Sequence, residues 1–92
     1  MIDKNGILKS IPSMEKVVLE LGVGNKKRIS NAIGIDIIDG ESVDIVGDAL
    51  EVLKVIKDSS VDQVYSFHFL EHIEDYIQVV NEIIRILKKD GL

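Results

Sequence analysis

Two glycines and two aspartates of this chain have the residue types and positions needed to hold a nucleoside. Gly22 and Gly24 follow an apolar run, and glycines there let the backbone approach a ligand without a Cβ atom in the way. Asp36 ends a second apolar run, and its carboxylate can accept hydrogen bonds from both hydroxyls of a ribose. Asp48 follows a third run, where it can accept from an adenine amino group while Ala49 covers the ring. Each feature alone has a plainer explanation, a tight turn or a helix cap, so the prediction depends on all of them together.

The strands that must position these residues follow from the hydrophobic pattern. Apolar, β-branched runs bounded by glycine and acidic residues predict strands over 17–21, 32–37, 43–46 and 61–67. The first two runs are continuous, as in strands of a parallel sheet that is covered on both faces. The carboxyl ends of such strands meet at one edge of the sheet, which is where open parallel sheets bind ligands.

Spacings of three and four between apolar residues predict two helices, over 49–57 and 73–87. The second helix has acidic residues at its start and basic residues at its end, and Gly91 lies beyond it, as helix dipole and C-cap preferences favour. Its apolar stripe consists of Ile73, Tyr76, Ile77, Val80, Ile83, Ile84 and Leu87. Strands that alternate with helices indicate an α/β fold. We expect a single domain over 1–92, with 1–15 as a lead-in segment.

The composition restricts the classes of function. The chain has 92 residues and a formal net charge of −5 without a basic stripe, so we expect no nucleic-acid interface. It has no cysteine, which excludes a disulfide framework and a thiolate metal site. No apolar run reaches the roughly 20 residues of a transmembrane helix, and the N-terminus lacks a signal-peptide pattern. We therefore expect a soluble cytoplasmic protein that has no membrane partner.

In their order along the chain, these features resemble class I S-adenosylmethionine-dependent methyltransferases, in the group called methyltransferase type 11. The matching stretches are 18–25 (VLELGVGN), 35–37 (IDI), 47–49 (GDA), 61–72 (VDQVYSFHFLEH) and 82–91 (EIIRILKKDG). The resemblance implies a truncated Rossmann-like open sheet, mainly parallel, of about four strands in the order 3-2-1-4 with flanking helices. It also implies transfer of a methyl group from S-adenosylmethionine to an acceptor by in-line displacement. The acidic charge balance, and not the resemblance, favours a small molecule over nucleic acid as that acceptor.

Carried onto this chain, the resemblance assigns cofactor binding to Glu20, Gly22, Gly24, Asn25, Asp36, Asp48, Ala49 and Phe67. Glu20 and the two glycines shape the pocket for the methionine end, Asp36 holds the ribose, and Asp48 with Ala49 contacts adenine. Phe67 and His68 line the methyl-transfer side, with His68 as the candidate general base. A plainer alternative makes Glu71 and His72 caps or surface partners of the long helix. We expect no metal, because histidines four positions apart are weak evidence for one.

The link between the first two predicted strands is too short for a full crossover helix. Asp36 stands 14 positions after Gly22, against about 20 in a dinucleotide fingerprint, and Lys26 replaces a glycine that is common in the family. We therefore expect a loop or a single helical turn, and an NAD site is disfavoured. In a similar subgroup of the family, a cofactor carboxylate can meet loop amides and a basic cluster such as Lys26-Lys27-Arg28.

The sequence ends at Leu92, where the family has a fifth strand. We expect a fragment that carries the cofactor half of the fold, with strand 61–67 forming a sheet edge that has unpaired backbone groups. Such an edge needs cover from the N-terminal segment, from a partner, or from a second copy of the chain in a homo-oligomer. An active methyltransferase has one alternative from another class, a non-catalytic module that binds an adenosyl ligand or a partner chain.

Overall fold

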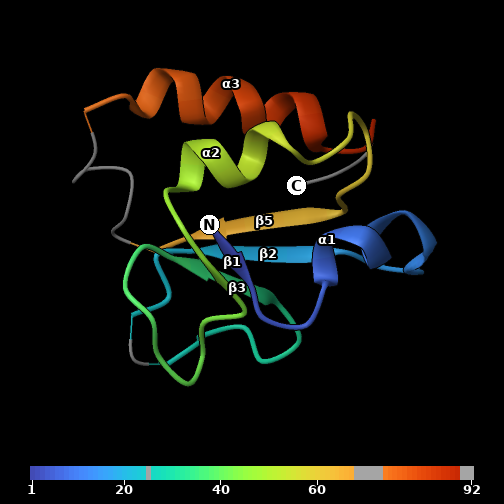
Figure 1. Ribbon diagram of the computed structural model, residues 1–92. Coiled ribbons are helices and arrows are strands. Elements are labelled where there is room, and N and C mark those ends of the chain that lie inside the picture. Colours follow the sequence, from blue (N-terminus) through green and yellow to red (C-terminus); the bar gives the residue numbers. More distant parts are fainter. Residues whose placement is uncertain (25, 68–73, 90–92) are drawn as a thin grey trace.

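Five short strands form one sheet, shown in Figure 1 as a computed structural model that describes residues 1–24, 26–67 and 74–89. In chain order the elements are β1 (Ile2–Asp3), α1 (Ile7–Ser10), the 3-10 helix η1 (Ile11–Ser13), β2 (Val18–Leu21), β3 (Ile33–Asp36), β4 (Ile45–Val46), α2 (Ala49–Lys54), β5 (Gln63–Ser66) and α3 (Tyr76–Ile86). The strand order is β1-β4-β3-β2-β5, with β1 antiparallel to β4 and the other pairs parallel. None of the described helices is long and apolar enough to cross a membrane.

The four predicted strands correspond to β2, β3, β4 and β5, and they lie in the predicted order 3-2-1-4. This confirms the α/β class and the mainly parallel, open sheet. The lead-in segment adds a fifth strand, β1, which the sequence pattern did not predict. Asp3 at the end of β1 accepts hydrogen bonds from the backbone amides of Ile7 and Leu8, each at 2.8 Å, and so starts α1.

One face of the sheet packs against α2 and α3, which lie together above it in Figure 1. The register places Leu19 beside Ile33, and Leu21 beside Ile35, so alternate residues of neighbouring strands share this face. The core consists mainly of Leu19, Leu21, Ile33, Ile35, Ile45, Leu50, Val52, Leu53, Ile56, Val79 and Ile86. Full burial of a side chain of this size contributes about 1.5–3 kcal/mol, so this layer is the main source of stability.

The two predicted helices are present but shorter than expected. Helix α2 ends at Lys54, and α3 spans 76–86 of the predicted 73–87, with residue 73 outside the described residues. The apolar stripe of α3 is only partly used: Val79 and Ile86 are buried, whereas Tyr76, Ile77 and Ile84 are exposed. The apolar arc of this helix is therefore wider than the surface on which it packs.

The end of α3 lies beside the start of β5. Backbone amides of Ser60 and Val61 donate to the carbonyl of Ile86 at 2.8 and 2.9 Å, which satisfies a carbonyl that the helix leaves free. Leu87 then forms a parallel bridge with Val61. The chain after α3 thus begins to pair with the edge that was expected to be open. The N-terminal segment, one of the expected covers, instead pairs with β4 at the opposite edge of the sheet.

Asp62 joins three segments at the amino end of the strands. Its carboxylate accepts a hydrogen bond from the amide of Val17 at 2.7 Å and pairs with Lys88 Nζ at 3.1 Å. The backbone hydrogen bond from Val17, followed by the one from Lys88, lowers the pKa of Asp62 below its ordinary value. The charged form of Asp62 thus holds the start of β2, the start of β5 and the chain after α3 together.

At Gly34 in β3, another backbone segment approaches the strand closely. A Cβ atom at Gly34 would lie 2.3 Å from the carbonyl oxygen of Ser42. Asp44 holds this neighbouring segment, residues 42–44, against Gly34. Its carboxylate accepts from the Gly34 amide at 2.7 Å, and its amide donates to the Gly34 carbonyl at 2.8 Å. Because the obstructing atom belongs to backbone, the segment must shift to admit a side chain.

We predict that Gly34→Ala lowers the free energy of unfolding by about 1–3 kcal/mol, the usual cost of overpacking. Gly40→Ala is the matched control, because its nearest neighbour would lie at an ordinary 3.7 Å. Urea denaturation of both variants measures the difference. Equal stability of the two variants would show that the close backbone approach at Gly34 does not require a glycine.

Candidate functional site

The carboxyl ends of β2, β3 and β4 meet at one edge of the sheet, and hydrogen bonds join the segments that follow them. The amide of Gly24, after β2, donates to Asp36 Oδ2 at 2.8 Å, and Asp36 is the last residue of β3. The amide of Gly47, after β4, donates to the Asp36 carbonyl at 2.9 Å and is followed directly by Asp48. The structure therefore brings together the glycine loop, Asp36 and Asp48, as open parallel sheets do at their ligand edge.

Both glycines of the loop adopt the left-handed conformation, with φ of 67° at Gly22 and 62° at Gly24. The Gly22 amide donates to the Ile35 carbonyl at 2.8 Å, so the chain leaves β2 in register with β3. Apart from Gly24 and its chain neighbours, no atom of the described residues lies within 4 Å of the place that a Cβ at Gly24 would take. The backbone of the loop is thus open to a ligand at Gly24.

Asp36 is fixed from two sides but keeps acceptor capacity. Its Oδ2 accepts from the Gly24 amide, and its Oδ1 accepts from the Ile38 amide at 3.0 Å. Each carboxylate oxygen has two acceptor sites, so one site on each oxygen remains. Two parallel acceptors on one rigid side chain match the two adjacent hydroxyls of a ribose.

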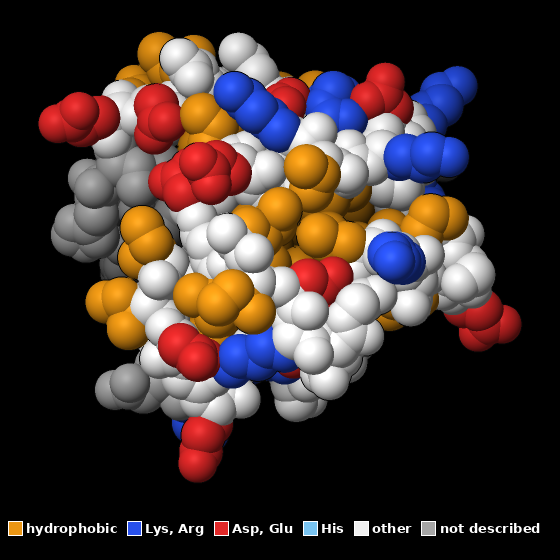
Figure 2. Space-filling view, viewed as in Figure 1, with side chains coloured by type: hydrophobic (Ala, Val, Ile, Leu, Met, Phe, Trp, Pro, Cys, Tyr) orange, Lys and Arg blue, Asp and Glu red, His pale blue; other side chains and the backbone are white. Residues whose placement is uncertain are grey.

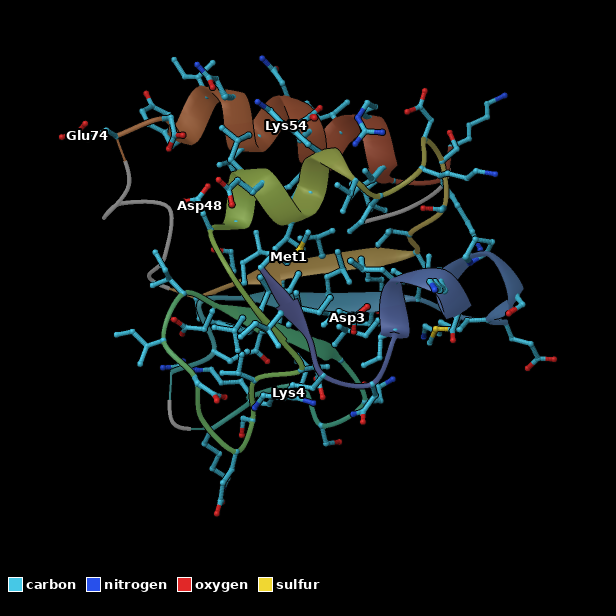
Figure 3. The ribbon with its side chains drawn as sticks, in the orientation of Figure 1. Met1, Asp3, Lys4, Asp48, Lys54 and Glu74 are labelled. Carbon is cyan, nitrogen blue, oxygen red and sulfur yellow. The ribbon has the colours of Figure 1, made fainter. Side chains whose placement is uncertain are left out.

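Asp48 caps helix α2, the plainer of its two predicted roles. It is the N-cap residue, and its Oδ2 accepts from the Glu51 amide at a long 3.3 Å. Figure 3 shows its side chain at the first turn of α2. The Asp48 side chain is exposed, whereas Ala49 is 8% exposed and packs into the protein. The cap occupies one acceptor site of the carboxylate, and no hydrogen bond from the described residues engages the other oxygen.

Glu20 makes contacts that the sequence did not predict. It is 2% exposed, and its Oε1 accepts from the amides of Arg28 and Ile29, both at 2.9 Å. In the register of the sheet Glu20 pairs with Gly34 and Tyr65, on the face opposite Leu19 and Leu21. The carboxylate therefore binds the link between β2 and β3 and shapes the glycine loop through that link.

The link over 22–32 contains no helix in its described residues, as its length predicted.

Two cations of this link, Lys27 and Arg28, have separate partners. Lys27 pairs with Asp44 at 2.7 Å, so this lysine is held away from a ligand. The guanidinium of Arg28 lies over the ring of Phe67, 5.0 Å from its centroid, and that ring stacks on Tyr65. Phe67 thus lies at the ligand edge, on the face that carries Glu20, beneath a cation.

Ser66 is a polar residue of this edge that the sequence analysis overlooked. Its hydroxyl is buried and has no hydrogen-bond partner among the described residues. It is the last residue of β5, beside Leu21 in the register, and so lies next to the start of the glycine loop. The available signal was a small hydroxyl residue at the end of an apolar strand. A buried hydroxyl without a partner costs about 1–3 kcal/mol, and a ligand group can remove that cost.

Asn25, His68, Glu71 and His72 lie outside the described residues. Within the described ranges, no group of three His, Cys, Asp or Glu side chains converges as metal ligands do.

Figure 2 shows a concave region away from this edge, where hydrophobic side chains gather between α1 and α2. It has a volume of about 190 Å³ and is lined by Leu8, Lys9, Ile11, Pro12, Val55, Ile56 and Lys57. These residues come from the segment before β2 and the segment after α2, on the side where β2 and β5 begin. This hollow is therefore separate from the ligand edge.

We predict that Glu20→Ala lowers the free energy of unfolding by about 1–3 kcal/mol, because it leaves the part-buried amides of Arg28 and Ile29 without their acceptor. Hydrogen exchange should become much faster at the amides of Arg28 and Ile29. Glu20→Gln, which keeps an acceptor oxygen, is the matched control and should cause a smaller change. Unchanged exchange in Glu20→Ala would show that the carboxylate does not hold the link.

Comparison with known proteins places these features in one family pattern. Residues 19–92 match a family model that is described as a methyltransferase domain. The match covers most of the chain, including the glycine loop, Asp36, Asp48 and the long helix. No curated protein sequence matches the chain.

Proposed function

The chain belongs to the methyltransferase domain family, and on that premise we propose that its ligand edge binds S-adenosylmethionine for methyl transfer to an acceptor. The observation that carries the proposal is the hydrogen-bonded connection of Gly24, Asp36 and the Gly47–Asp48 segment. Three segments that are separate in the sequence thereby present exposed backbone and two carboxylates at one place.

The nucleoside half of the cofactor fits the two aspartates. Asp36 has one acceptor site left on each carboxylate oxygen, enough for the two ribose hydroxyls. Asp48 follows on the neighbouring segment and keeps one oxygen for the adenine amino group. Hydrogen bonds to charged groups contribute about 1.5–3 kcal/mol each, so Asp36 should dominate this half of the site.

The methionine half fits the glycine loop and the end of β5. Gly24 exposes backbone at the loop, and the buried Ser66 hydroxyl offers a donor and acceptor without a partner among the described residues. Arg28 supplies a cation for the carboxylate. Its backbone is held by Glu20, its side chain lies on Phe67, and no ion pair engages its guanidinium within the described part of the chain. Lys27 is excluded from this role because it pairs with Asp44.

Methyl transfer depends more on the alignment of the reacting groups than on acid or base catalysis. When bound, the cofactor supplies a methyl group on a sulfonium sulfur; the acceptor forms its bond to that methyl as the sulfur–methyl bond breaks, and sulfur keeps the electron pair. The residues of this edge would hold the ribose and the carboxylate at two fixed points and thereby orient the group between them. Such positioning can supply about 7–11 kcal/mol of the barrier. His68 stays the candidate base for an acceptor that must lose a proton.

We propose a small molecule as the acceptor. The net charge of −5 is unfavourable for a polyanion such as nucleic acid, which binds through clustered cations. A cytoplasmic location stays a prediction from the sequence.

The first test is binding of S-adenosylhomocysteine by isothermal titration calorimetry. We expect the wild-type chain to bind, and Asp36→Ala to lower the affinity about 10- to 100-fold, because it removes charge-assisted hydrogen bonds. Asp39→Ala is the matched control, since Asp39 is an exposed residue of the same turn that pairs with Lys4. No binding by the wild-type chain would contradict the proposal and favour a non-catalytic module. Preferential binding of NAD would point to a dinucleotide enzyme.

The second test separates the carboxylate from the nucleoside. We predict that Arg28→Gln lowers the affinity for S-adenosylhomocysteine about tenfold or more but leaves the affinity for 5′-methylthioadenosine, which lacks the amino acid portion, unchanged. Lys26→Gln, two residues away in the same link, is the control. An equal loss for both ligands would show that Arg28 acts only through the fold of the link. No loss for either ligand would remove Arg28 from the site.

A further inference from the structure

The hollow between α1 and α2 is built partly from the hydrophobic core. Two of its lining residues, Ile11 and Ile56, are buried, with exposed fractions of 3% and 4%, and Leu8 packs against the same core. Val55 also lines the hollow but is 57% exposed, so it marks the open side. The hollow is therefore an apolar depression that the described residues leave open to solvent (Figure 2).

Backbone contacts hold both walls of the hollow. On the wall formed by α1, Asp3 accepts hydrogen bonds from the amides at the start of the helix. On the wall after α2, the Ser60 hydroxyl donates to the Lys57 carbonyl at 2.8 Å, and the Ser60 amide donates to the Ile86 carbonyl at 2.8 Å. A site whose walls are already fixed needs little ordering when a ligand binds.

Two lysines line the hollow, and no acidic residue of the described part of the chain does so. Lys9 lies in α1 and Lys57 follows α2, so each wall contributes one cation. Within the described residues neither ammonium group has an ion pair. Asp58, the chain neighbour of Lys57, pairs with Arg85 instead. In a chain with a net charge of −5, the hollow therefore has a local positive charge that is complementary to an anion.

The volume of the hollow sets the size of the apolar part of a ligand. An apolar cavity of roughly 150 Å³ is large enough to bind benzene. At about 190 Å³, this hollow has room for a ring or chain of about six carbons. A longer chain would extend past the exposed Val55 into solvent.

We propose that the hollow binds a small carboxylate whose apolar part has about six carbons. The apolar part contacts Ile11, Val55 and Ile56, and Lys9 and Lys57 attract the carboxylate. Burial of the apolar part supplies most of the affinity, and the two lysines select the charge. The hollow lies on the side where β2 and β5 begin, away from the ligand edge, so the inference does not rest on the proposed function.

The first test varies the ligand and measures its affinity by NMR titration of the wild-type chain. Each of the two methylenes that distinguish heptanoate from pentanoate should raise the affinity about threefold, as burial of a methylene does. Nonanoate should bind no more than about twofold more tightly than heptanoate, because its last carbons stay in water. Hexylammonium has the same six-carbon chain with the opposite charge, and should bind about tenfold more weakly than heptanoate. Equal affinity for heptanoate and hexylammonium, or an affinity that does not rise with chain length, would overturn the proposal.

The second test locates the site. Heptanoate should shift the amide signals of residues 8–11 and 55–57. Val55→Trp fills the hollow from its open side and should lower the affinity about tenfold or more. Ile84→Trp is the matched control, because Ile84 is 65% exposed on α3 and does not line the hollow. Circular dichroism checks that both variants keep the fold. Signal shifts confined to other residues, or an equal loss in both variants, would overturn the proposal.

The third test concerns the two lysines. Lys9→Gln and Lys57→Gln should each lower the affinity for heptanoate about two- to fivefold, the range expected for exposed ion pairs, and leave the affinity for hexanol unchanged. Lys54→Gln is the matched control, because Lys54 is an exposed lysine of α2 that does not line the hollow (Figure 3). Unchanged heptanoate affinity in both Lys9→Gln and Lys57→Gln would overturn the assigned carboxylate specificity.

Discussion

A buried carboxylate, that of Glu20, holds the link that joins the two central strands β2 and β3. In a parallel sheet this connection is usually a helix, which satisfies its own backbone and packs an apolar face on the strands. Here the link is too short, and two of its amides donate to Glu20 from the face of the sheet opposite the main core. One carboxylate side chain thus does locally what the first turn of a crossover helix does elsewhere, because it accepts from two part-buried amides of the link.

The consequences of this contact reach the ligand edge in two steps. Holding Arg28 and Ile29 fixes one end of the link, and the Asp36 contact with the Gly24 amide fixes the other. Between them Lys27 pairs with Asp44. Polar contacts, rather than a packed helix, therefore set the position of the glycine loop. In the same arrangement the Arg28 side chain lies over the Phe67 ring. The backbone of Gly24 stays open.

On the opposite face of the sheet the contacts are apolar. There α2 and α3 pack on aliphatic side chains of the strands, and the contacts are non-directional. Helix α3 has more apolar surface than this layer covers, since Tyr76, Ile77 and Ile84 stay exposed. The helix is thus divided lengthwise between a side that packs into the domain and a side on which apolar residues stay exposed. The apolar layer thus lies on one face of the sheet, and the Glu20 contacts that hold the link lie on the other.

The order of the four strands β2 to β5 came from the family resemblance. The sequence by itself determined those four strands and the helix-free link. These depend on local pattern: continuous apolar runs, spacings of three and four, and glycines after a strand are properties of neighbouring residues. It also identified Gly24, Asp36 and Asp48 as one group. Only the tertiary structure decided which partner each polar side chain takes. Glu20 binds the link, Asp48 caps α2, and β1 pairs with β4, because each contact joins residues whose proximity comes from the fold and not from their spacing. For the same reason the apolar stripe of α3 predicted a helix correctly, but only the packed structure showed which half of that stripe is buried.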